Sequence, residues 1–428
     1  MFVKKIEKLP SNVKRVLKRS SVLSRKLDVA IYLVGGIVRD FILGRDNFDL
    51  DIVVEGDGLK FAHALGEHYK ADFRKHHSFG TATVYFKGFK VDIATARRES
   101  YPHPGALPVI TRSTLKEDLI RRDFSINAMA LSLNRDDYGG LIDYYKGYTD
   151  LRDGIIRVLH DRSFTDDPTR IFRAIRFEQR FGFRMRRGTL KLLKSALAKG
   201  ALKTVNEQRL RDELALMFEE EHPSRCVKRV QALIGWRFLN AQVRLSSKEL
   251  ALFRHLDETV RVYQKSFPHY PKVDRRALYF AGLLLPLDVK EVLTVSARFG
   301  LRKNERTVAL AVGKAYRKIY RVCRGRIDPV RLYTVLSGYP LEVILFCYAY
   351  YYRNRTVKKN LLFYLDKLFG VSLKVRGRDL KKLGFGPERS YSKVFTKLLH
   401  KKIEKDFRSR REELKELKKL AKDHLRKK

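Results

Sequence analysis

The sequence predicts an α+β protein in which a mixed α/β domain comes first and an entirely helical part follows. Three observations lead to this fold class. Short β-rich runs alternate with helical segments up to about residue 155. From about residue 166 onward, apolar residues recur at helical spacing and the strand pattern almost disappears. The chain of 428 residues is also long enough for two to four domains, each with a core of its own.

The first domain is expected to begin with helix and then to alternate between strands and helices. Residues 1–30 are typical of helix, with a helix start at Pro10-Ser11. The dipeptide Lys87-Gly88 separates two β-rich runs and predicts a hairpin. The expected strands are residues 31–34, 50–54, 82–86 and 89–93, and the expected helices are residues 36–43 and 60–68.

In the second part, helices are clearest at residues 169–181 and 189–197. The apolar run 343–352 predicts a buried helix, because a bilayer span needs roughly 20 residues. From Lys401 on, leucines at helical spacing predict a basic helix, with a solvated charge run as the alternative. The leucines are Leu414, Leu417 and Leu420, and breaks between helices are expected at Glu221-His222-Pro223, Phe267-Pro268 and Gly338-Tyr339-Pro340.

The charge balance indicates a polyanionic partner. Lys and Arg number 91 against 48 Asp and Glu, which gives a net charge of +43. A surplus of this size repels itself in the folded state, so RNA, DNA or an acidic membrane is expected to neutralise it. The alternative is a thermophile-like surface crowded with charge, but such surfaces usually balance Lys against Glu.

Cysteine usage and the N-terminus predict a reducing, cytoplasmic compartment. The three cysteines, Cys226, Cys323 and Cys347, show neither the paired spacing of a zinc site nor a disulfide framework. The segment Met1–Lys14 is charged and lacks the apolar core of a signal peptide. Because no apolar run is long enough to cross a bilayer, no membrane association is expected.

The first candidate site element is Gly35-Gly36-Ile37-Val38-Arg39-Asp40, between a predicted strand and a predicted helix. Two glycines at such a junction let backbone N–H groups approach a phosphate chain, and the helix N-terminus adds positive potential. Arg39 lies one helical turn in, where it can reach the same phosphates. A Gly-Gly pair alone is more often a plain turn, so the neighbouring carboxylates give it its weight.

Three aspartates predict a magnesium site. Residues two apart in a strand point to the same face, so Asp49 and Asp51 project together. Asp92 ends another predicted strand, and an adjacent position in the sheet would bring it to the same place. Three carboxylates can hold two Mg²⁺ ions about 4 Å apart, which suits an in-line displacement at phosphorus. For Asp-x-Asp alone, capping a turn or pairing with arginine is an equally good interpretation.

A second cluster is Arg121-Arg122-Asp123-Phe124-Ser125-Ile126-Asn127. Asp123 and Asn127 are four residues apart, so both are expected on one helical face. The arginines could contact phosphates while Asp123 accepts from a ribose hydroxyl. A surface helix that begins with an acid remains the alternative.

A third cluster is Asp166-Asp167-Pro168-Thr169-Arg170. Asp166 or Asp167 is expected to cap a helix, with Pro168 in its first turn. Arg170, Arg173 and Arg176 then form a row along one side of that helix. Three arginines in a row repel one another unless phosphates or acids face them.

Together these motifs resemble the class II tRNA nucleotidyltransferases, a family related to the bacterial poly(A) polymerases. The resemblance covers residues 32–218 and meets the family motifs in order. It implies a polymerase-beta-like nucleotidyltransferase head at residues 1–155, followed by an all-α neck at 156–225, body at 226–340 and tail at 341–428. The motifs are Gly-Gly-x-Val-Arg-Asp, Asp-x-Asp, Val-Asp-Ile-Ala at 91–94, Arg-Arg-Asp-Phe at 121–124 and acid-Asp-x-x-Arg at 166–170.

The family implies a role for each matching residue. Asp49 and Asp51 would bind Mg²⁺, and Asp92 would help to activate the 3′-hydroxyl of RNA. Base reading is implied for Asp167 and Arg170, and the helical parts would grip the acceptor and TΨC arm of tRNA. Contacts to the triphosphate or ribose are implied for Gly35, Gly36, Arg39, Arg122, Asp123 and Asn127, and support of the base site for Arg173 and Arg176.

Two positions depart from the family pattern. The segment 143–147 keeps the Asp and one Gly of Asp-x-x-Gly-Gly, which bears on the hinge between head and neck. Asn206 stands where Ser is common. The stretches 101–108, with three prolines, and 159–164 resemble the bacterial A-adding enzymes. This likeness implies addition of the terminal A of CCA to tRNA from ATP.

The chemistry of bases supports the implied role of Asp167 and Arg170. Adenine and cytosine both offer an amino donor beside a ring-nitrogen acceptor, which a carboxylate and a guanidinium complement. Guanine and uracil would set a carbonyl against the carboxylate and a ring N–H against the guanidinium, leaving buried polar groups unpaired. The sequence therefore predicts use of ATP or CTP, without choosing between them.

Four alternatives remain at this stage. Within the enzyme class, a full CCA-adding enzyme that uses CTP and ATP, or a poly(A) polymerase, would share every active-site motif. A non-catalytic RNA-binding module with a relic nucleotide pocket would have no reason to keep three costly acids. A metal-dependent phosphohydrolase is disfavoured because the sequence lacks a His cluster.

Overall fold

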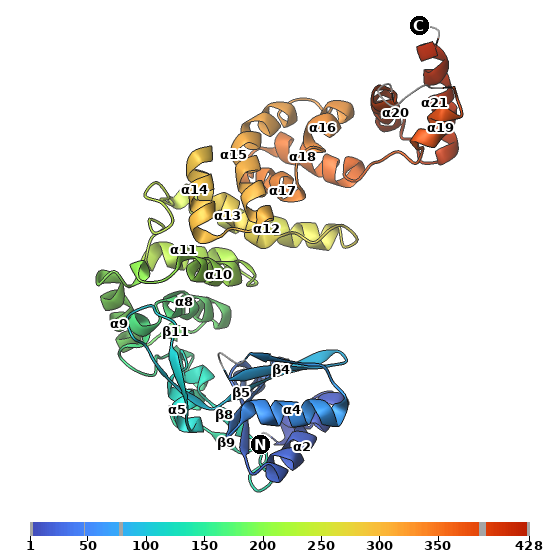
Figure 1. Cartoon of the computed structure of the whole chain (residues 1–428). Helices are drawn as coiled ribbons and strands as arrows, with labels where there is room; N and C mark the ends of the chain where they lie inside the picture. The colour runs from blue at the N-terminus through green and yellow to red at the C-terminus, as the bar shows by residue number, and fades with distance from the viewer. Residues whose placement is uncertain (1–2, 47, 77–79, 385–390, 426–428) are drawn as a thin grey trace. The chain divides into compact units, whose positions relative to one another are not determined.

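The computed structural model of the chain describes residues 3–46, 48–76, 80–384 and 391–425. The chain divides into two compact units, Met1–Phe238 and Leu239–Lys428 (Figure 1). The first unit combines β-sheet with helices, and the described part of the second unit is built from helices. The predicted α+β fold class is therefore confirmed. The finer division into head, neck, body and tail stays a prediction.

Seven strands form the main sheet of the first unit, in the order β3-β4-β5-β2-β1-β8-β9. Neighbouring strands are antiparallel except β2 and β5, which run parallel. The four predicted strands correspond to β1, β2, β4 and β5, and the predicted hairpin joins β4 to β5. The strands are β1 (Ala30–Val34), β2 (Leu50–Glu55), β3 (Phe73–His76), β4 (Thr81–Phe86), β5 (Phe89–Thr95), β8 (Ala130–Ser132) and β9 (Leu141–Ile142).

Several short strands escape the sequence analysis. Strand β3 is a charged strand at the edge of the sheet, where polar residues are tolerated, and β9 has only two residues. Two smaller sheets complete the unit. They are the antiparallel hairpin of β6 (Arg97–Ser100) with β7 (Val109–Arg112), and the parallel pair of β10 (Ile155–Ile156) with β11 (Arg184–Met185).

Helices of the first unit correspond closely to the predicted ones. The helices predicted at 36–43 and 169–181 have the bounds of α3 and α8. The break expected at 221–223 separates α10 from α11. The helices are α1 (Val3–Ile6), α2 (Ser11–Lys26), α3 (Gly36–Leu43), α4 (Gly58–Tyr69), α5 (Leu115–Ile120), α6 (Gly147–Arg152), α7 (Ser163–Asp166), α8 (Thr169–Phe181), α9 (Arg187–Ala198), α10 (Glu207–Phe218) and α11 (Pro223–Leu233), with 3-10 turns η2 (Ser125–Asn127) and η3 (Ala201–Lys203).

The two faces of the main sheet are covered differently. Helices α2 and α4 contact each other, and α4 packs on β2, β4 and β5 (Figure 1). Elsewhere, Val53 of β2 joins Leu115 and Leu119 of α5 in one apolar cluster. Because alternate residues of a strand share a face, Asp51 lies on the same face of the sheet as Val53. The face that α5 covers therefore carries the candidate carboxylates.

The start of α8 differs from its prediction. Pro168, and neither aspartate, is the N-cap residue, and Asp166 is the last residue of α7. Asp167 lies between the two helices with extended backbone, and its Oδ1 accepts hydrogen bonds from the backbone N–H and the hydroxyl of Thr169. The prediction of an aspartate N-cap was wrong because a short helix, absent from the sequence pattern, ends directly before Asp167.

Both departures from the family pattern have local physical consequences. The Oδ1 atom of Asn206 accepts from the backbone N–H of Gln208 at 2.8 Å, so Asn206 caps α10 as Ser would. Lys146 stands where the family has Gly and has a φ of 61°. This left-handed conformation costs a residue with a side chain on the order of 1 kcal/mol. Asp143 accepts from the N–H groups of Gly147 and Tyr148 and holds this turn in place.

The second unit is helical throughout its described residues. The breaks predicted at 267–268 and 338–340 separate α12 from α13 and α16 from α17. The apolar run predicted as a buried helix is α17, in which every residue from Leu341 to Cys347 is buried. The helices are α12 (Ser247–Ser266), α13 (Arg275–Leu284), α14 (Val289–Phe299), α15 (Lys303–Cys323), α16 (Pro329–Leu336), α17 (Leu341–Tyr350), α18 (Arg355–Phe363), α19 (Gly377–Lys381), α20 (Tyr391–Lys405) and α21 (Arg410–Leu425), with a π-helical turn η4 (Tyr364–Leu368).

No single helix among the described residues is both long and apolar enough to cross a membrane. The pair α16 and α17, bent by 115°, passes the same test by length and composition only.

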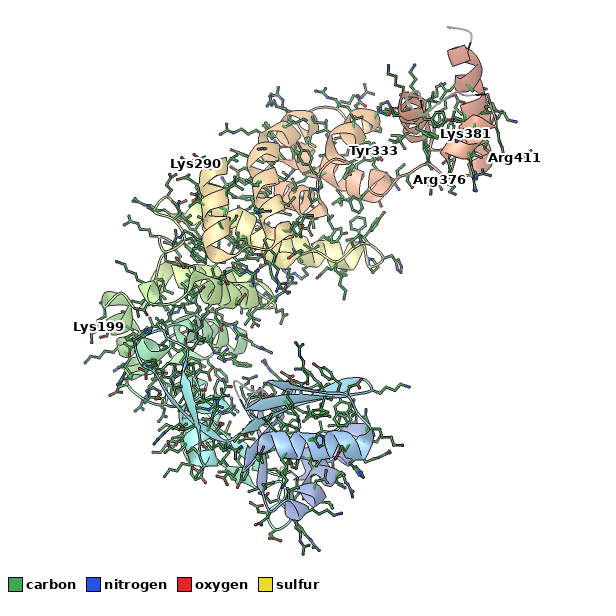
Figure 2. The ribbon with its side chains drawn as sticks, in the orientation of Figure 1. Lys199, Lys290, Tyr333, Arg376, Lys381 and Arg411 are labelled. Atoms are coloured by element: carbon green, nitrogen blue, oxygen red, sulfur yellow. The ribbon has the colours of Figure 1, made fainter. Side chains whose placement is uncertain are left out.

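The C-terminal segment is two helices and not the one that the sequence predicts. Helix α20 ends at Lys405, Asp406 takes a φ of 51°, and α21 begins at Arg410. The predicted leucine spacing is confirmed, because Leu417 is buried in an apolar cluster against which Leu414 and Leu420 pack. Exposed lysine and arginine side chains, among them Lys290, Lys381 and Arg411, cover the helices of this unit (Figure 2).

Replacing Gly147 with alanine should destabilise the first unit by about 1–3 kcal/mol, the usual cost of overpacking. An added Cβ would collide with the carbonyl oxygen of Ser125 and lie 2.7 Å from Cγ of Met129. Thermal unfolding followed by circular dichroism measures the loss. The matched control is Gly188→Ala in α9, where a Cβ would meet no atom of the described residues within 4 Å and stability should be unchanged or slightly higher. Equal unfolding temperatures for the two variants would contradict the packing described here.

Candidate functional site

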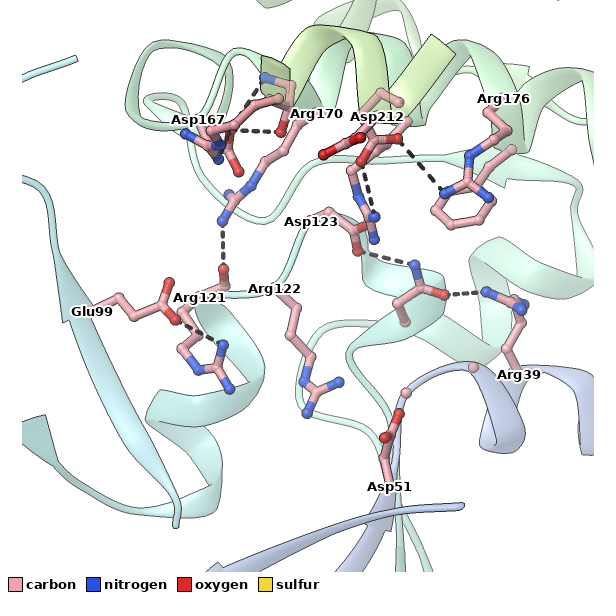
Figure 3. A pocket seen from close by; sticks show the side chains of 18 of the residues that line it. Arg39, Asp51, Glu99, Arg121, Arg122, Asp123, Asp167, Arg170, Arg176 and Asp212 are labelled. Carbon is pink, nitrogen blue, oxygen red and sulfur yellow. Dashed lines mark hydrogen bonds and ion pairs between the residues drawn. The ribbon is translucent and has the colours of Figure 1, made fainter. Parts of the chain in front are cut away.

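One cavity of about 820 Å³ in the first unit gathers the predicted site residues (Figure 3). Asp92 alone does not line it. The cavity runs from the carboxylates at β2 to the row of arginines on α8. Its lining comprises Gly35, Gly36, Arg39, Asp40, Asp49, Asp51, Glu99, Tyr101, Pro108, Arg121, Arg122, Asp123, Asn127, Asp167, Thr169, Arg170, Arg173, Arg176, Phe177, Arg180, Arg209, Asp212 and Glu213.

The junction of β1 with α3 lies directly against the carboxylates. Gly35 is the N-cap of α3 and has a φ of 80°, which favours glycine. A Cβ on Gly35 would lie 3.1 Å from Nη1 of Arg122 and 3.4 Å from Oδ2 of Asp51. The N-cap Gly35 makes no side-chain cap hydrogen bond, so that residue leaves the N–H groups of the first turn of α3 uncapped. The predicted phosphate-binding turn therefore sits beside both a carboxylate and a guanidinium.

The strand pairing brings the three aspartates together. Strands β2 and β5 are parallel, and Asp51 is the register partner of Asp92. Burial raises the pKa of Asp51 to about 6, and the charges of Asp49 and Asp92 add to the increase while Arg122 opposes it. A buried carboxylate that faces two others is stabilised by a cation, and hard dications such as Mg²⁺ prefer oxygen ligands. The donor set therefore fits the predicted metal.

Both carboxylate oxygens of Asp92 accept hydrogen bonds from side chains of β4 and β5. Its Oδ1 accepts from Oγ1 of Thr83 at 2.5 Å, and its Oδ2 accepts from the ammonium of Lys90. The same ammonium lies 3.8 Å from Oδ1 of Asp49. Among the described residues, no three acidic, histidine or cysteine side chains are already gathered closely enough to hold a metal ion.

Buried ion pairs hold the two predicted arginines of the second cluster. Asp118 on α5 is fully buried and accepts from Arg121 at 2.6 Å and from Nη2 of Arg122 at 3.1 Å. Burial alone would raise the pKa of Asp118, but Arg122 and Arg121 outweigh it and keep it below its ordinary value. Nε of Arg122 is buried and has no hydrogen-bond partner in the described part of the chain. Arg122 thus keeps donor capacity for a ligand in the cavity.

Asp123 and Asn127 contact each other, but not as residues of one α-helix. Phe124 is extended and only residues 125–127 form a 3-10 turn, so the predicted helical face was wrong. The tight turn still brings Nδ2 of Asn127 to 2.9 Å from Oδ1 of Asp123. Asn127 also accepts from Nη1 of Arg39 at 2.6 Å, which links this turn to α3.

Arg39 is buried and its guanidinium is already engaged. It donates to both carboxylate oxygens of Asp40 and stacks over Phe177 and Phe181 of α8, 5.4 and 4.8 Å from their ring centroids. Its side chain therefore braces α3 against α8. This geometry favours a role in positioning the turn over a direct phosphate contact.

The row of arginines on α8 faces acids. Arg173 donates to Oδ2 of Asp123 at 2.6 and 2.9 Å. Arg176 forms ion pairs with Glu213 on α10 and with Glu220, which follows α10. Burial opposes ionisation of Asp123, yet Arg173 and the bond from Asn127 lower its pKa to about 2. Acids are one of the two partners that the spacing of these arginines requires, and they compensate most of the charge of the row.

Asp167 and Arg170 line the far end of the cavity, each held by other partners. Among the described residues, the hydrogen bonds to the side chain of Asp167 end on Oδ1, including one from Nη2 of Arg209 at 3.0 Å, so Oδ2 can accept from a ligand. Arg170 donates to Oγ of Ser163 at 2.8 Å. It also donates to the carbonyl oxygen of Arg121 at 2.6 Å (Figure 3). These bonds fix both side chains in place before a ligand arrives.

The segment 101–108 forms the loop between β6 and β7. Tyr101 and Pro108 line the cavity, and Gly105 lies close to Thr204, where an added Cβ would collide with the carbonyl oxygen. The N–H of Gly105 donates to the carbonyl oxygen of Asp166 at 3.2 Å, and Arg209 donates to the carbonyl oxygen of Gly105 at 3.3 Å. The loop is thereby tied to the residues around Asp167.

Sequence reasoning missed several residues that line the cavity or hold its lining in place. Asp118 could have been found, because it lies three and four residues before Arg121 and Arg122 and such spacings pair on a helix. Arg209 and Glu213 carry no comparable local signal, since their partners lie far away in the chain, and Glu99 pairs both with Arg97, two residues before it, and with the distant Arg121. They compensate the charges of predicted residues and were not recognisable one by one.

Replacing Arg173 with methionine should destabilise the protein by about 3–5 kcal/mol at neutral pH, because Asp123 would stay buried without its counter-charge. The pKa of Asp123, about 2 in the folded chain, lies below its ordinary value. Its contribution to stability is therefore present above about pH 4 and is lost as the pH falls toward 2. Unfolding measured across this range should show the gap between the two proteins narrowing in acid. The exposed pair Arg152–Asp153 provides the control Arg152→Met, with little effect expected. A gap that does not change with pH would contradict this pairing.

Comparison with known proteins extends the likeness beyond single motifs. The Poly A polymerase head domain family matches residues 31–157. An A-adding tRNA nucleotidyltransferase of Geobacter sulfurreducens is 34% identical over 420 residues, which are 96% of this chain and 48% of the relative. An A-adding tRNA nucleotidyltransferase of Halalkalibacterium halodurans is 32% identical over 403 residues, which are 90% of this chain and 87% of the relative. The chain spans about half the length of the first relative and most of the second.

Two solved structures are similar over almost the whole chain. A CCA-adding enzyme in an apo form has a TM-score of 0.81 and 34% identity, over 97% of this chain and 98% of that one. The Thermotoga maritima CCA-adding enzyme complexed with tRNA-CCA has a TM-score of 0.77 and 34% identity, over 97% of this chain and 98% of that one. With these likenesses and the cavity residues together, the chain belongs to the class II tRNA nucleotidyltransferase family.

Proposed function

We propose that the chain is a template-independent tRNA nucleotidyltransferase that adds the terminal A of CCA to tRNA from ATP. One observation carries the proposal. A single cavity joins three features: a partly buried carboxylate beside a glycine turn, arginine side chains along its wall, and Asp167 with Arg170 at the far end. This order matches a nucleoside triphosphate, with phosphates and metal at one end and the base at the other.

The carboxylate end would hold two Mg²⁺ ions, with Asp49 and Asp51 as ligands and Asp92 close by. Bound there, the ions would stabilise the attacking and leaving oxygens of an in-line displacement. Asp51 is the best supported ligand, since its burial leaves it short of compensating charge. Asp92, the register partner of Asp51, would accept the proton of the RNA 3′-hydroxyl as that hydroxyl attacks the α-phosphate and pyrophosphate leaves.

The middle of the cavity would bind the triphosphate and ribose. The N–H groups at the start of α3, around Gly35 and Gly36, suit phosphate oxygens. Arg122 adds a guanidinium with an unbonded buried Nε and a nitrogen directly beside Gly35. Asp123 and Asn127 would lie near the ribose, and Arg39, Arg173 and Arg176 would hold the surrounding turns through their ion pairs.

The far end would read the base. Oδ2 of Asp167 can accept an amino group while Arg170 donates to a ring nitrogen, which fits adenine and cytosine alike. Because both side chains are fixed by Arg209, Ser163 and the carbonyl of Arg121, a mismatched edge cannot be accommodated by a simple swing. Exclusion of GTP and UTP follows from this rigidity.

Several observations support tRNA as the partner and the terminal A as the product. The net charge of +43 calls for a polyanion, and a similar solved enzyme was complexed with tRNA-CCA. The helical residues 156–225, 226–340 and 341–428 would act as neck, body and tail and contact the acceptor and TΨC arm. Both of the curated relatives described above are A-adding, which favours ATP over CTP. The proposed compartment is the cytoplasm, where tRNA is processed.

The carboxylate assignment predicts that Asp51→Asn abolishes nucleotide incorporation while tRNA binding stays within a few-fold. The loss should be at least about a thousandfold, because metal catalysis supplies several kcal/mol to such displacements. Incorporation of labelled ATP into tRNA ending in CC, with binding measured by filter retention, separates the two effects. Asp72→Asn, an exposed carboxylate next to strand β3, is the control and should keep full activity. Retained turnover in the Asp51 variant would remove the two-metal assignment.

Product choice is tested by a single-turnover comparison of ATP on tRNA ending in CC with CTP on tRNA lacking CCA. We expect efficient addition of one A, little use of CTP, and use of GTP or UTP at least about a hundredfold lower than that of ATP. Efficient addition of both cytidines would instead identify a full CCA-adding enzyme. Long A tails on unrelated RNA would identify a poly(A) polymerase. Either outcome would leave the fold and the metal assignment intact.

A further inference from the structure

One lysine reaches into the carboxylate cluster. Lys90 lies on β5, two residues before Asp92, so the two side chains project from the same face of the strand. Its ammonium donates to Oδ2 of Asp92 and lies 3.8 Å from Oδ1 of Asp49. A single positive group thus stands between two of the three aspartates of the predicted magnesium site.

This position conflicts with a divalent cation. A cation that binds Asp49 and Asp92 needs the oxygens that the ammonium contacts, and the two positive charges would repel each other at that distance. The ammonium and the metal ion therefore exclude each other from these oxygens.

The two oxygens of Asp92 differ in how easily they become available. Oδ1 is bonded to Thr83, a buried residue of β4 that is the register partner of Asp92 and cannot move without disturbing the sheet. Oδ2 is bonded to Lys90, whose side chain is 49% exposed and carried on a flexible stem. Movement of the lysine into solvent therefore frees one oxygen of Asp92 at little cost.

We propose that Lys90 is the resident counter-ion of the Asp49, Asp51 and Asp92 cluster, and that a divalent cation must displace it to bind. The proposal rests on the metal assignment made above. Lys90 lets the carboxylates stay together in the metal-free protein, and it raises the metal concentration at which the site fills. It is a positioning residue for the metal ligands and takes no part in the chemical step.

The test measures Mn²⁺ binding to the full chain without nucleotide or tRNA, by electron paramagnetic resonance of the free ion. Lys90→Gln should bind Mn²⁺ roughly two- to fivefold more tightly than the wild type, the range spanned by partly exposed ion pairs. Lys90→Arg, which keeps the charge, should restore the weaker affinity. Lys87→Gln removes an exposed charge from the turn of the same hairpin and should leave affinity within experimental error. Without metal, Lys90→Gln should unfold at a lower temperature than the wild type, and Mn²⁺ should raise its unfolding temperature by more.

Three results would overturn the inference. An unchanged or weaker Mn²⁺ affinity in Lys90→Gln would mean that the lysine does not compete with the ion. An equal gain in Mn²⁺ affinity in Lys87→Gln would mean that the effect comes from the lower net charge of the protein and not from the position of Lys90. If the wild type and Asp51→Asn bind Mn²⁺ equally, the metal assignment itself fails, and this outcome is distinguishable because it does not involve Lys90.

Discussion

The parallel pairing of β2 with β5 is the constraint on which the rest of the site depends. It sets Asp51 beside Asp92 on one face of the sheet, with Asp49 two residues away. Carboxylates held together in this way repel one another, and the raised pKa of Asp51 reflects that repulsion together with burial. The strand pairing therefore concentrates negative charge at one place, and nearby positive side chains compensate only part of it.

Arginine and lysine side chains from different elements supply this partial compensation. Arg122 reaches the cluster from the end of α5, and Lys90 reaches it from β5. Neither is held by the aspartates alone, because Arg122 is also bonded to Asp118 and Lys90 is half exposed. Because the aspartates are partly compensated, the site is stable without a ligand. A divalent cation can still bind there, since its higher charge compensates the carboxylates more fully.

The same principle connects the carboxylate end of the cavity to its far end. Arg173 and Arg170, both on α8, bond to Asp123 and to the carbonyl of Arg121. These two adjacent attachments fix the helix against the segment that also carries Arg122. The separation between Asp51 and Asp167 is thus set by buried, charge-assisted bonds, which are stronger and more directional than surface pairs. Rigid spacing of this kind suits selection of one ligand length and one base edge.

Predictions from the sequence succeeded where the signal is local and periodic. Helix 169–181 was predicted with its observed bounds, because a strong apolar period and flanking Pro and Gly mark both ends. The predictions were wrong where a regular helix was assumed from the spacing of two residues or from one charged run. Asp123 and Asn127 are four residues apart, but the chain between them forms a tight turn and not an α-helix. The C-terminal charged segment is divided into two helices at Asp406. Strand β3 was missed because an edge strand needs no apolar alternation.

The sequence by itself determined four strands and the longer helices of the first unit, the family, and most of the side chains of the site, since spacing fixes the relation between near neighbours in a strand or helix. It could not determine which charges compensate one another. Arg173 meets Asp123 across 50 residues of chain, and Arg209 meets Asp167 across 42. Such pairings depend on the packing of whole elements, and no local pattern encodes them. Only the tertiary structure therefore decided which arginines are already neutralised and which donors remain for a ligand.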